Sequence, residues 1–135
     1  MPPTIPESHR DLFDKPLTVT LATVLPDGQP HLTAVWINYE PDGDLLVACL
    51  NTAQKAINIA HTPKATVMAI DTEQPFRYIE VCCDASILSD DIEEITRIRK
   101  QIVESYGRPH TADVDMTTRV ILRLTPTKVI PHGRE

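Results

Sequence analysis

The chain has 135 residues, of which 41% are hydrophobic and 24% are charged, and its formal net charge is -6. This length suits one compact domain with a hydrophobic core, so residues 1–135 are predicted to form a single domain. The negative charge, with no cluster of lysine and arginine, argues against a nucleic-acid surface, because the affinity of such surfaces rests largely on neutralising phosphates. No apolar stretch approaches the ~20 residues that cross a bilayer and no secretory signal opens the chain, which predicts a cytoplasmic protein without membrane contact.

The first part of the chain predicts antiparallel strands joined by tight turns. A short amphipathic segment covers about residues 7–14. Residues 17–25 then alternate leucine and valine with threonine, which is typical of a half-buried strand. Pro-Asp-Gly turns separate this strand from a second at about residues 31–39, and the second strand from a third at 45–50. Two tight turns in succession predict an antiparallel meander.

The rest of the chain adds two helices and the closing strands. A short helix is predicted over about residues 53–60, because Pro63 stops it. A longer helix over about residues 90–106 opens with acidic residues and carries isoleucines at spacings of three and four, which gives one apolar stripe. Six or seven strands joined by short turns, with two or three helices, predict a mainly β fold: a β-barrel with added helices. The remaining strands are predicted at residues 65–70, 78–88, 119–124 and 128–130.

The junction of the third strand and the short helix predicts an anion-binding site. Residues 50–58 read Leu-Asn-Thr-Ala-Gln-Lys-Ala-Ile-Asn, with Thr52 as the expected N-cap and Lys55 in the first helical turn. Unpaired backbone N–H groups and the helix dipole place partial positive charge there, and Lys55 adds a full charge. We expect this junction to hold a phosphate of a flavin-like cofactor. The alternative is a short surface helix capped by Thr52, with Lys55 solvated.

The second predicted strand carries the only tryptophan. Trp36 follows the polar residues His31 and Thr33, so one face could combine hydrogen-bond donors with a large flat surface. The alternatives are a tryptophan in the core and a structural histidine. Further along, Arg77 and Glu80 are predicted on opposite faces of a strand, so that one of them faces a ligand or a partner subunit; the alternative is a solvated arginine.

Several other chemistries lack their motifs. The four glycines lie far apart, so neither a dinucleotide-binding loop nor a P-loop can be drawn. The five histidines show no metal-ligand spacing, and the HExxH and GxSxG motifs are absent, so no metal site is predicted. Cys49, Cys82 and Cys83 are predicted to be buried thiols, because no CxxC pair or even disulfide framework can be drawn from them.

Taken in order, these segments resemble the pyridoxamine 5'-phosphate oxidase-like family of split β-barrels, and within it the short branch that uses the deazaflavin coenzyme F420. The resemblance runs from about Ile5 to His132 and implies a six- to seven-stranded antiparallel split barrel of the FMN-binding type. The segments that carry it are Leu21-Ala22-Thr23-Val24 with Pro26-Asp27-Gly28, Pro30-His31-Leu32-Thr33 with Val35-Trp36, Asn51-Thr52 with Lys55 and Asn58, Pro63, Arg77-Tyr78-Ile79-Glu80-Val81, and Arg119 to Pro126.

The resemblance also implies a homodimer with two cofactor sites at the subunit interface. The chain departs from the family in two places: only Ala53 and Gln54 separate Thr52 from the helix lysine, and Cys82-Cys83 stand where relatives often have Arg-Gly. The implied phosphate-binding residues are Asn51, Thr52, Lys55 and Asn58; the implied ring-binding residues are Val35, Trp36 and Ile37, with Thr33 and His31 nearby; and Arg77 and Tyr78 are implied as contributions of the partner subunit.

The function implied by the resemblance is hydride transfer between a bound coenzyme F420 and a planar unsaturated small molecule. The cofactor supplies the chemistry, so His31 is at most a weak candidate for a proton donor. One alternative is an FMN-binding pyridoxamine 5'-phosphate oxidase-like oxidase or reductase. Another is a non-catalytic carrier of a cofactor or tetrapyrrole such as haem, for which His61 and His110 are the candidate ligands.

Overall fold

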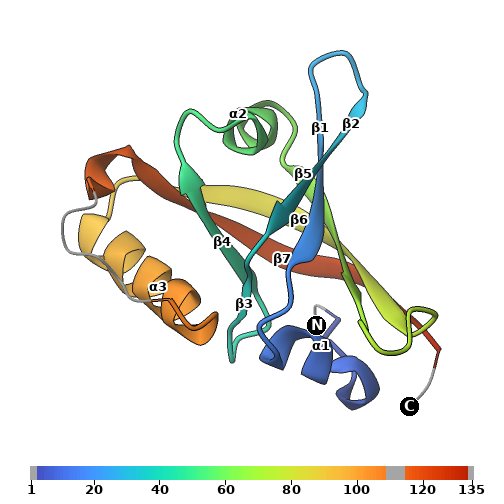
Figure 1. Ribbon diagram of the computed structural model, residues 1–135. Helices are drawn as coiled ribbons and strands as arrows, with labels where there is room; N and C mark the ends of the chain where they lie inside the picture. The colour runs from blue at the N-terminus through green and yellow to red at the C-terminus, as the bar shows by residue number, and fades with distance from the viewer. Residues whose placement is uncertain (1–2, 109–114, 134–135) are drawn as a thin grey trace.

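The computed structural model describes residues 3–108 and 115–133, and within these ranges seven strands form one curled antiparallel sheet (Figure 1). The strands are β1 (Val19–Val24), β2 (Pro30–Val35), β3 (Asn38–Tyr39), β4 (Leu45–Leu50), β5 (Lys64–Ile70), β6 (Tyr78–Leu88) and β7 (Arg119–His132). The α-helices are α1 (Asp11–Asp14), α2 (Gln54–His61) and α3 (Ile92–Ser105), and short 3-10 helices cover Glu7–His9 and Met116–Thr118. No helix in the described ranges is long and apolar enough to cross a membrane.

The strand order explains why the sheet curls. It runs β2-β1-β5-β6-β7-β4-β3, so β2 and β3 are at opposite edges although they are neighbours in sequence. Only Trp36 and Ile37 connect them, and three peptide steps span at most about 11 Å. The two edges must therefore come close together. The result is the predicted mainly β split barrel.

Two predicted strands have different limits in the structure. The strand expected at residues 31–39 is interrupted at Trp36 and Ile37, where the chain crosses from one edge of the sheet to the other. The two short strands expected at the end of the chain are one long strand, β7. Its register against β6 shifts between Cys82 and Cys83, which pair with Lys128 and Pro126. Such a bulge accommodates a proline within a sheet, and the proline is what makes the sequence look like two strands.

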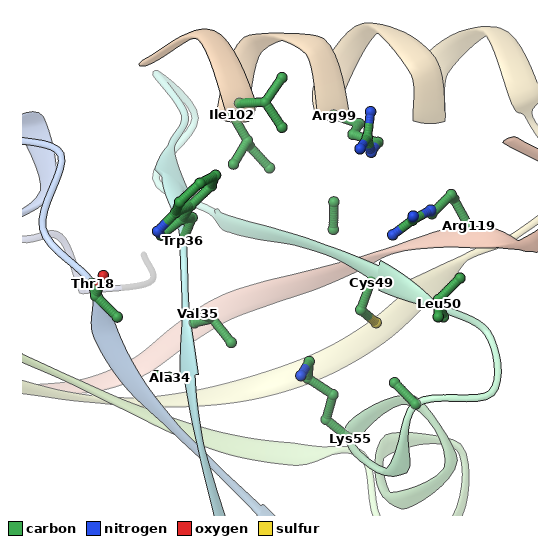
Figure 2. Close-up of a pocket in the computed structure, with 13 residues that line it drawn as sticks. Thr18, Ala34, Val35, Trp36, Cys49, Leu50, Lys55, Arg99, Ile102 and Arg119 are labelled. Atoms are coloured by element: carbon green, nitrogen blue, oxygen red, sulfur yellow. The ribbon is translucent and has the colours of Figure 1, made fainter. Parts of the chain in front are cut away.

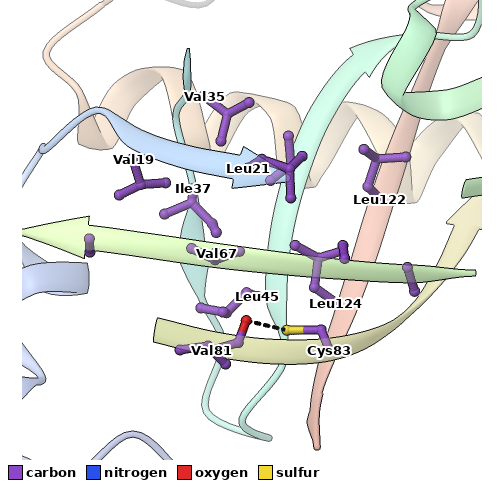
Figure 3. Close-up of a cluster of buried hydrophobic side chains, with 14 of the residues drawn as sticks. Val19, Leu21, Val35, Ile37, Leu45, Val67, Val81, Cys83, Leu122 and Leu124 are labelled. Carbon is purple, nitrogen blue, oxygen red and sulfur yellow. Dashed lines mark hydrogen bonds between the residues drawn. The ribbon is translucent and has the colours of Figure 1, made fainter. Parts of the chain in front are cut away.

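The main core lies on the inner face of the curled sheet (Figure 3). Side chains alternate along each strand, so every second residue of β1, β4, β5, β6 and β7 points inward. Leu21, Val67, Val81, Leu122 and Leu124 are completely buried there. The interior is filled by side chains, so a bound molecule has to sit at the split.

Helix α3 covers the outer face of β4 and β7, beside the split (Figure 1). Its isoleucine stripe, Ile95, Ile98 and Ile102, packs on Leu46 and Ile121, which point outward from the two strands. The stripe predicted from the sequence is therefore confirmed. This second cluster places α3 where it overhangs the gap between β4 and β2.

Tyr106 fixes the end of α3 to the connection between the two sheet edges. Its hydroxyl donates to the carbonyl oxygen of Leu17 at 2.6 Å and accepts from the backbone N–H of Ile37 at 3.1 Å. Its ring stacks on Trp36 with centroids 4.9 Å apart and an interplanar angle of 11°. The position of Trp36 at the split is thus set by the helix as well as by the strands.

Candidate functional site

A cavity of about 500 Å³ opens at the split between β2 and β4, below α3 (Figure 2). Among the described residues, β3 pairs only with Leu45 and Leu46 of β4. The rest of that edge of β4 has no strand partner in the described ranges, and it faces the equally open edge of β2. The incomplete barrel therefore leaves a gap lined by backbone edges and side chains of both strands.

The walls of the cavity are largely apolar. Val35 ends β2 and Trp36 follows it, Ala48 comes from β4, and Ile102 and Val103 come from α3. Small and aliphatic side chains beside an indole leave a slot suited to a planar ring, because such rings bind by burying apolar surface. These residues give the cavity its apolar character.

Three basic residues from different elements surround the same cavity. Lys55 extends from α2, Arg99 from α3, and Arg119 from the first position of β7. Figure 2 shows the two arginines on the α3 side and Lys55 on the α2 side. No acidic side chain of the described ranges lines the cavity. In a chain of net charge -6 this concentrates positive potential in one place and attracts an anion.

Two of the three cations are not neutralised within the described part of the chain. Lys55 and Arg119 make no ion pair there, and the Nε atom of Arg119 is buried without a hydrogen-bond partner. An unsatisfied buried donor costs about 1–3 kcal/mol, so an acceptor at this point would be favourable. Burial, and then the positive charge of Arg119, lowers the pKa of Arg99. The cavity thus has the donors and the charge to hold an oxyanion.

Cys49 lies between the basic residues but does not act as a nucleophile in this environment. Burial raises the pKa of its thiol to about 11, although Lys55 and Arg119 act in the opposite direction. The thiol is therefore protonated at neutral pH, and reactivity requires the thiolate. Cys49 serves as a small neutral part of the wall.

The structure brings together three of the residues named by the resemblance. Val35, Trp36 and Lys55 all line the cavity, with Lys55 in the first turn of α2 as expected. The predicted cap of that helix is wrong. Ala53 occupies the N-cap position and provides no side-chain hydrogen bond. The backbone N–H of Ala53 donates to the carbonyl oxygen of Leu50 and closes a turn, so the helix begins one residue later than predicted.

Three residues expected at the phosphate do not line this cavity. Thr52 is exposed beside the turn, and Asn51 lines a separate groove next to α2 and the end of β6. Asn58 is completely buried: its amide donates to Thr23 Oγ1 at 3.0 Å and its carbonyl oxygen accepts from Gln54 Nε2 at 2.7 Å. Asn58 therefore anchors α2 to β1.

Arg77 has a different role from the one expected of a ligand contact. Only 3% of the residue is exposed, and its guanidinium forms ion pairs with Asp11 and with Asp71, the latter at 2.9 Å. It also donates to the carbonyl oxygen of Ser8 at 2.7 Å. Arg77 thus ties the N-terminal segment to the β5–β6 turn and does not line the cavity. Neighbouring Tyr78 stacks on His132, with centroids 4.3 Å apart.

The other residues predicted on the second strand, in β2 and in the connection that follows it, face the interior. Ile37 is 2% exposed and belongs to the main core. His31 and Thr33 lie opposite Thr23 and Leu21, and their Nδ1 and Oγ1 atoms are buried without hydrogen-bond partners among the described residues. Neither residue lines the cavity, so the structure gives no support to His31 as a proton donor.

Of the two histidines considered for haem, only His61 lies within the described residues. His61 is exposed at the end of α2 and lines the separate groove, and His110 lies outside the described residues. Within residues 3–108 and 115–133, no group of three or more His, Cys, Asp and Glu side chains is arranged to hold a metal ion.

Sequence reasoning missed the two arginines of the site. The residue pairing places Arg119 opposite Leu50, because β4 lies next to β7 in the sheet. Arg99 projects from α3 into the same space because that helix packs on the outer face of the two strands. Both positions depend on contacts between distant segments. The only local signal is that Arg119 follows a polar connection and opens an apolar strand.

The chain matches the pyridoxamine 5'-phosphate oxidase family over residues 5–133. It is similar to a solved structure described as an F420 reductase, at 30% identity and a TM-score of 0.82, over 93% of this chain and 98% of that chain. A conserved hypothetical protein from Mycobacterium tuberculosis has 27% identity and a TM-score of 0.79, over 96% and 86% of the two chains. Comparison with curated protein sequences gave no match.

A more distant structure shares the fold alone. General Stress Protein 26 from Bacillus anthracis has 23% identity and a TM-score of 0.71, over 96% of this chain and 94% of that chain.

The match to the family model along almost the whole sequence, together with the similarity to the F420 reductase, places the chain in a class of flavin-type oxidoreductases. It belongs to the pyridoxamine 5'-phosphate oxidase family.

Proposed function

We propose that the chain binds a flavin-type cofactor, a deazaflavin of the coenzyme F420 type, in the cavity at the split. In this role it is an oxidoreductase that transfers a hydride between the cofactor ring and a planar unsaturated small molecule. The observation that carries the proposal is the set of three cations around an apolar slot, where no acidic residue of the described ranges lines the wall. The similarity to an F420 reductase supports the deazaflavin over FMN.

Different residues are proposed to bind the phosphate and the ring of the cofactor. Lys55, at the α2 side, is the proposed contact for the cofactor phosphate, because it has a full charge and makes no ion pair within the described ranges. Val35 and Trp36 are the proposed contacts for the ring, since they form the apolar wall at the end of β2. The cofactor itself supplies the hydride chemistry when bound. The chain therefore needs no dedicated acid or base.

Exclusion of water is the second contribution of the protein. Ile102 and Val103 of α3 form an apolar wall above the cavity, and Cys49 adds a neutral wall below. A dry site strengthens the attraction between the basic residues and an anionic ligand. It also keeps solvent away from the ring while a substrate stacks on it.

We propose that a second copy of the chain completes the site. The outer edge of β2 has no strand partner in the described ranges, and Leu32 on that strand is 64% exposed. Ala34 is exposed on the same face and also lines the cavity. A homodimer formed across this edge would cover both the apolar surface and the open side of the cavity.

Replacement of Lys55 by alanine tests the phosphate contact. A charge-assisted hydrogen bond to an oxyanion contributes about 1.5–3 kcal/mol, so K55A is expected to bind coenzyme F420 roughly tenfold to a hundredfold more weakly. Equilibrium dialysis against F420 and against FMN measures both affinities. If FMN binds the wild type tightly and F420 does not, FMN is the cofactor.

Lys64→Ala is the matched control. Lys64 is an exposed lysine near the other end of α2 that pairs with Asp84 and does not line the cavity. Its replacement should leave both affinities unchanged. Equal affinity in K55A and the wild type would contradict the phosphate assignment, and urea unfolding of each variant shows that its fold is intact.

A further inference from the structure

The α3 side of the cavity has basic groups that the Lys55 contact does not use. Arg99 and Arg119 line the cavity from different elements and lie side by side above it, across from Lys55 (Figure 2). One comes from the helix that overhangs the split and the other from the first position of β7. Two arginines at this wall add positive charge on the side of the cavity away from Lys55.

From this geometry we propose that Arg99 and Arg119 form a second oxyanion subsite, separate from the Lys55 contact, which binds a carboxylate or phosphate group. The proposal deepens the proposed function and rests on it only for the source of the oxyanion. Two sources share this chemistry: an anionic tail of the cofactor beyond its first phosphate, and an acidic group of a separate small molecule.

The local electrostatics favour an oxyanion at this place. Burial, and then the nearby positive charge of Arg119, lowers the pKa of Arg99, as expected for two cations that line one wall of the cavity. An oxyanion bound between the two guanidinium groups would be attracted by both charges. Planar guanidinium groups suit this task because each presents paired N–H donors to an oxyanion.

Hydrogen bonding gives a second, independent reason. The Nε donor of Arg119 is buried and has no partner among the described residues. By contrast, Arg123 on the same strand and the same face pairs with Asp44 at 3.1 Å. Arg123 is thus paired with a carboxylate of the chain itself, whereas Arg119 keeps a buried N–H donor without a partner in the described ranges.

The subsite also joins two elements that pack against each other. Helix α3 rests on β4 and β7 through an apolar cluster, and Arg99 and Arg119 stand at the cavity end of that contact. An oxyanion bound to both arginines would bridge the helix and the strand. Binding is therefore expected to raise the thermal stability of the protein by linkage.

Calorimetric titration of the full chain with inorganic pyrophosphate tests the subsite. Arg99→Gln and Arg119→Gln are each expected to bind pyrophosphate roughly tenfold to a hundredfold more weakly than the wild type. Arg97→Gln is the matched control, because Arg97 is an exposed arginine of α3 that pairs with Glu94 and does not line the cavity. Equal affinity in all four proteins would overturn the proposal. So would a loss of affinity in Lys55→Gln, titrated in the same way, with no loss in either Arg99→Gln or Arg119→Gln.

A conservative variant separates loss of charge from loss of fold. Arg119→Lys keeps the charge but not the fork of donors, so an intermediate affinity supports recognition by the guanidinium. Thermal unfolding of each variant with and without pyrophosphate gives a second readout. If Arg119→Gln does not fold, the Arg99→Gln and Arg119→Lys titrations decide the result: unchanged affinity in both contradicts the subsite.

Competition identifies the source of the oxyanion. Displacement of pyrophosphate by coenzyme F420 but not by FMN assigns the subsite to the cofactor tail. Binding that persists in the presence of either cofactor assigns it to a separate acidic molecule. Displacement by FMN would overturn the separation of the two subsites. If neither cofactor binds at all while the arginine variants still lose pyrophosphate, the proposed function fails and the subsite stands.

Discussion

Arg77→Met is expected to lower the free energy of unfolding by about 3 kcal/mol. The arginine side chain is 4% exposed and is bound to two carboxylates and a backbone carbonyl, so its removal takes the shared cation away from Asp71 and Asp11 and leaves Asp11 with the exposed Lys15. The expected loss is at the low end for a broken buried pair, because the side chain of Asp11 is 34% exposed and can be rehydrated. Equilibrium unfolding in urea measures it.

The pH dependence of unfolding distinguishes this ion-pair cluster from ordinary packing. Hydrogen bonds from Arg77 hold the pKa of Asp11 below its usual value, and the backbone N–H of Glu73, with Arg77, does the same for Asp71. Lowered carboxyl pKa values stabilise the fold above the unfolded pKa of about 3.9, and this contribution is lost as the pH falls through the folded pKa. The wild type should therefore lose stability below about pH 4.

In R77M the free energy of unfolding is expected to fall less steeply with decreasing pH than in the wild type. Arg97→Met is the matched control, since Arg97 pairs with Glu94 on the surface of α3 and should change stability by less than about 0.5 kcal/mol. If R77M has the free energy of unfolding of the wild type, or the same dependence of that free energy on pH below about pH 4, the ion-pair cluster contributes nothing to stability.

Ala34→Trp is expected to weaken cofactor binding about a hundredfold, which corresponds to roughly 2.7 kcal/mol. Ala34 is exposed on the edge strand and lines the cavity, so an indole at this position has room to project into the slot that the ring would occupy. The exposed starting position predicts a small effect on the fold itself. Equilibrium dialysis against coenzyme F420 measures the affinity, and urea unfolding measures the stability.

The matched control is Ser86→Trp, which adds the same side chain to another exposed small residue in a strand that does not line the cavity. It should bind the cofactor as the wild type does. Size-exclusion chromatography of both variants separates a blocked cavity from a broken dimer. Unchanged binding in a folded A34W protein would place the cofactor elsewhere.

Most of the sheet could be predicted from the sequence, because the alternation along each strand is a local property. Val19–Val24, Leu45–Leu50 and Tyr78–Leu88 lie within or coincide with the predicted strands. The interruption at Trp36 and Ile37 could not be predicted in this way. Both residues favour strands, and only the final strand order shows that the chain changes edges there.

The candidate site was only partly accessible from the sequence. Lys55 could be found because strand, turn and helix follow one another locally. Arg99 and Arg119 could not, since the cavity brings them near Lys55 only after α3 has packed on β4 and β7. The resemblance named Asn58 and Arg77, but both are occupied in buried hydrogen bonds that link distant elements.

Fluorescence of Trp36 during titration of the wild-type protein with coenzyme F420, and separately with FMN, tests the proposed site most directly. Trp36 is the only tryptophan of the chain and lines the cavity, so its emission reports on that place alone. Binding of a planar ring at the split predicts saturable quenching by one of the two cofactors. No saturable change with either cofactor would contradict the proposal that this cavity holds a flavin-type ring.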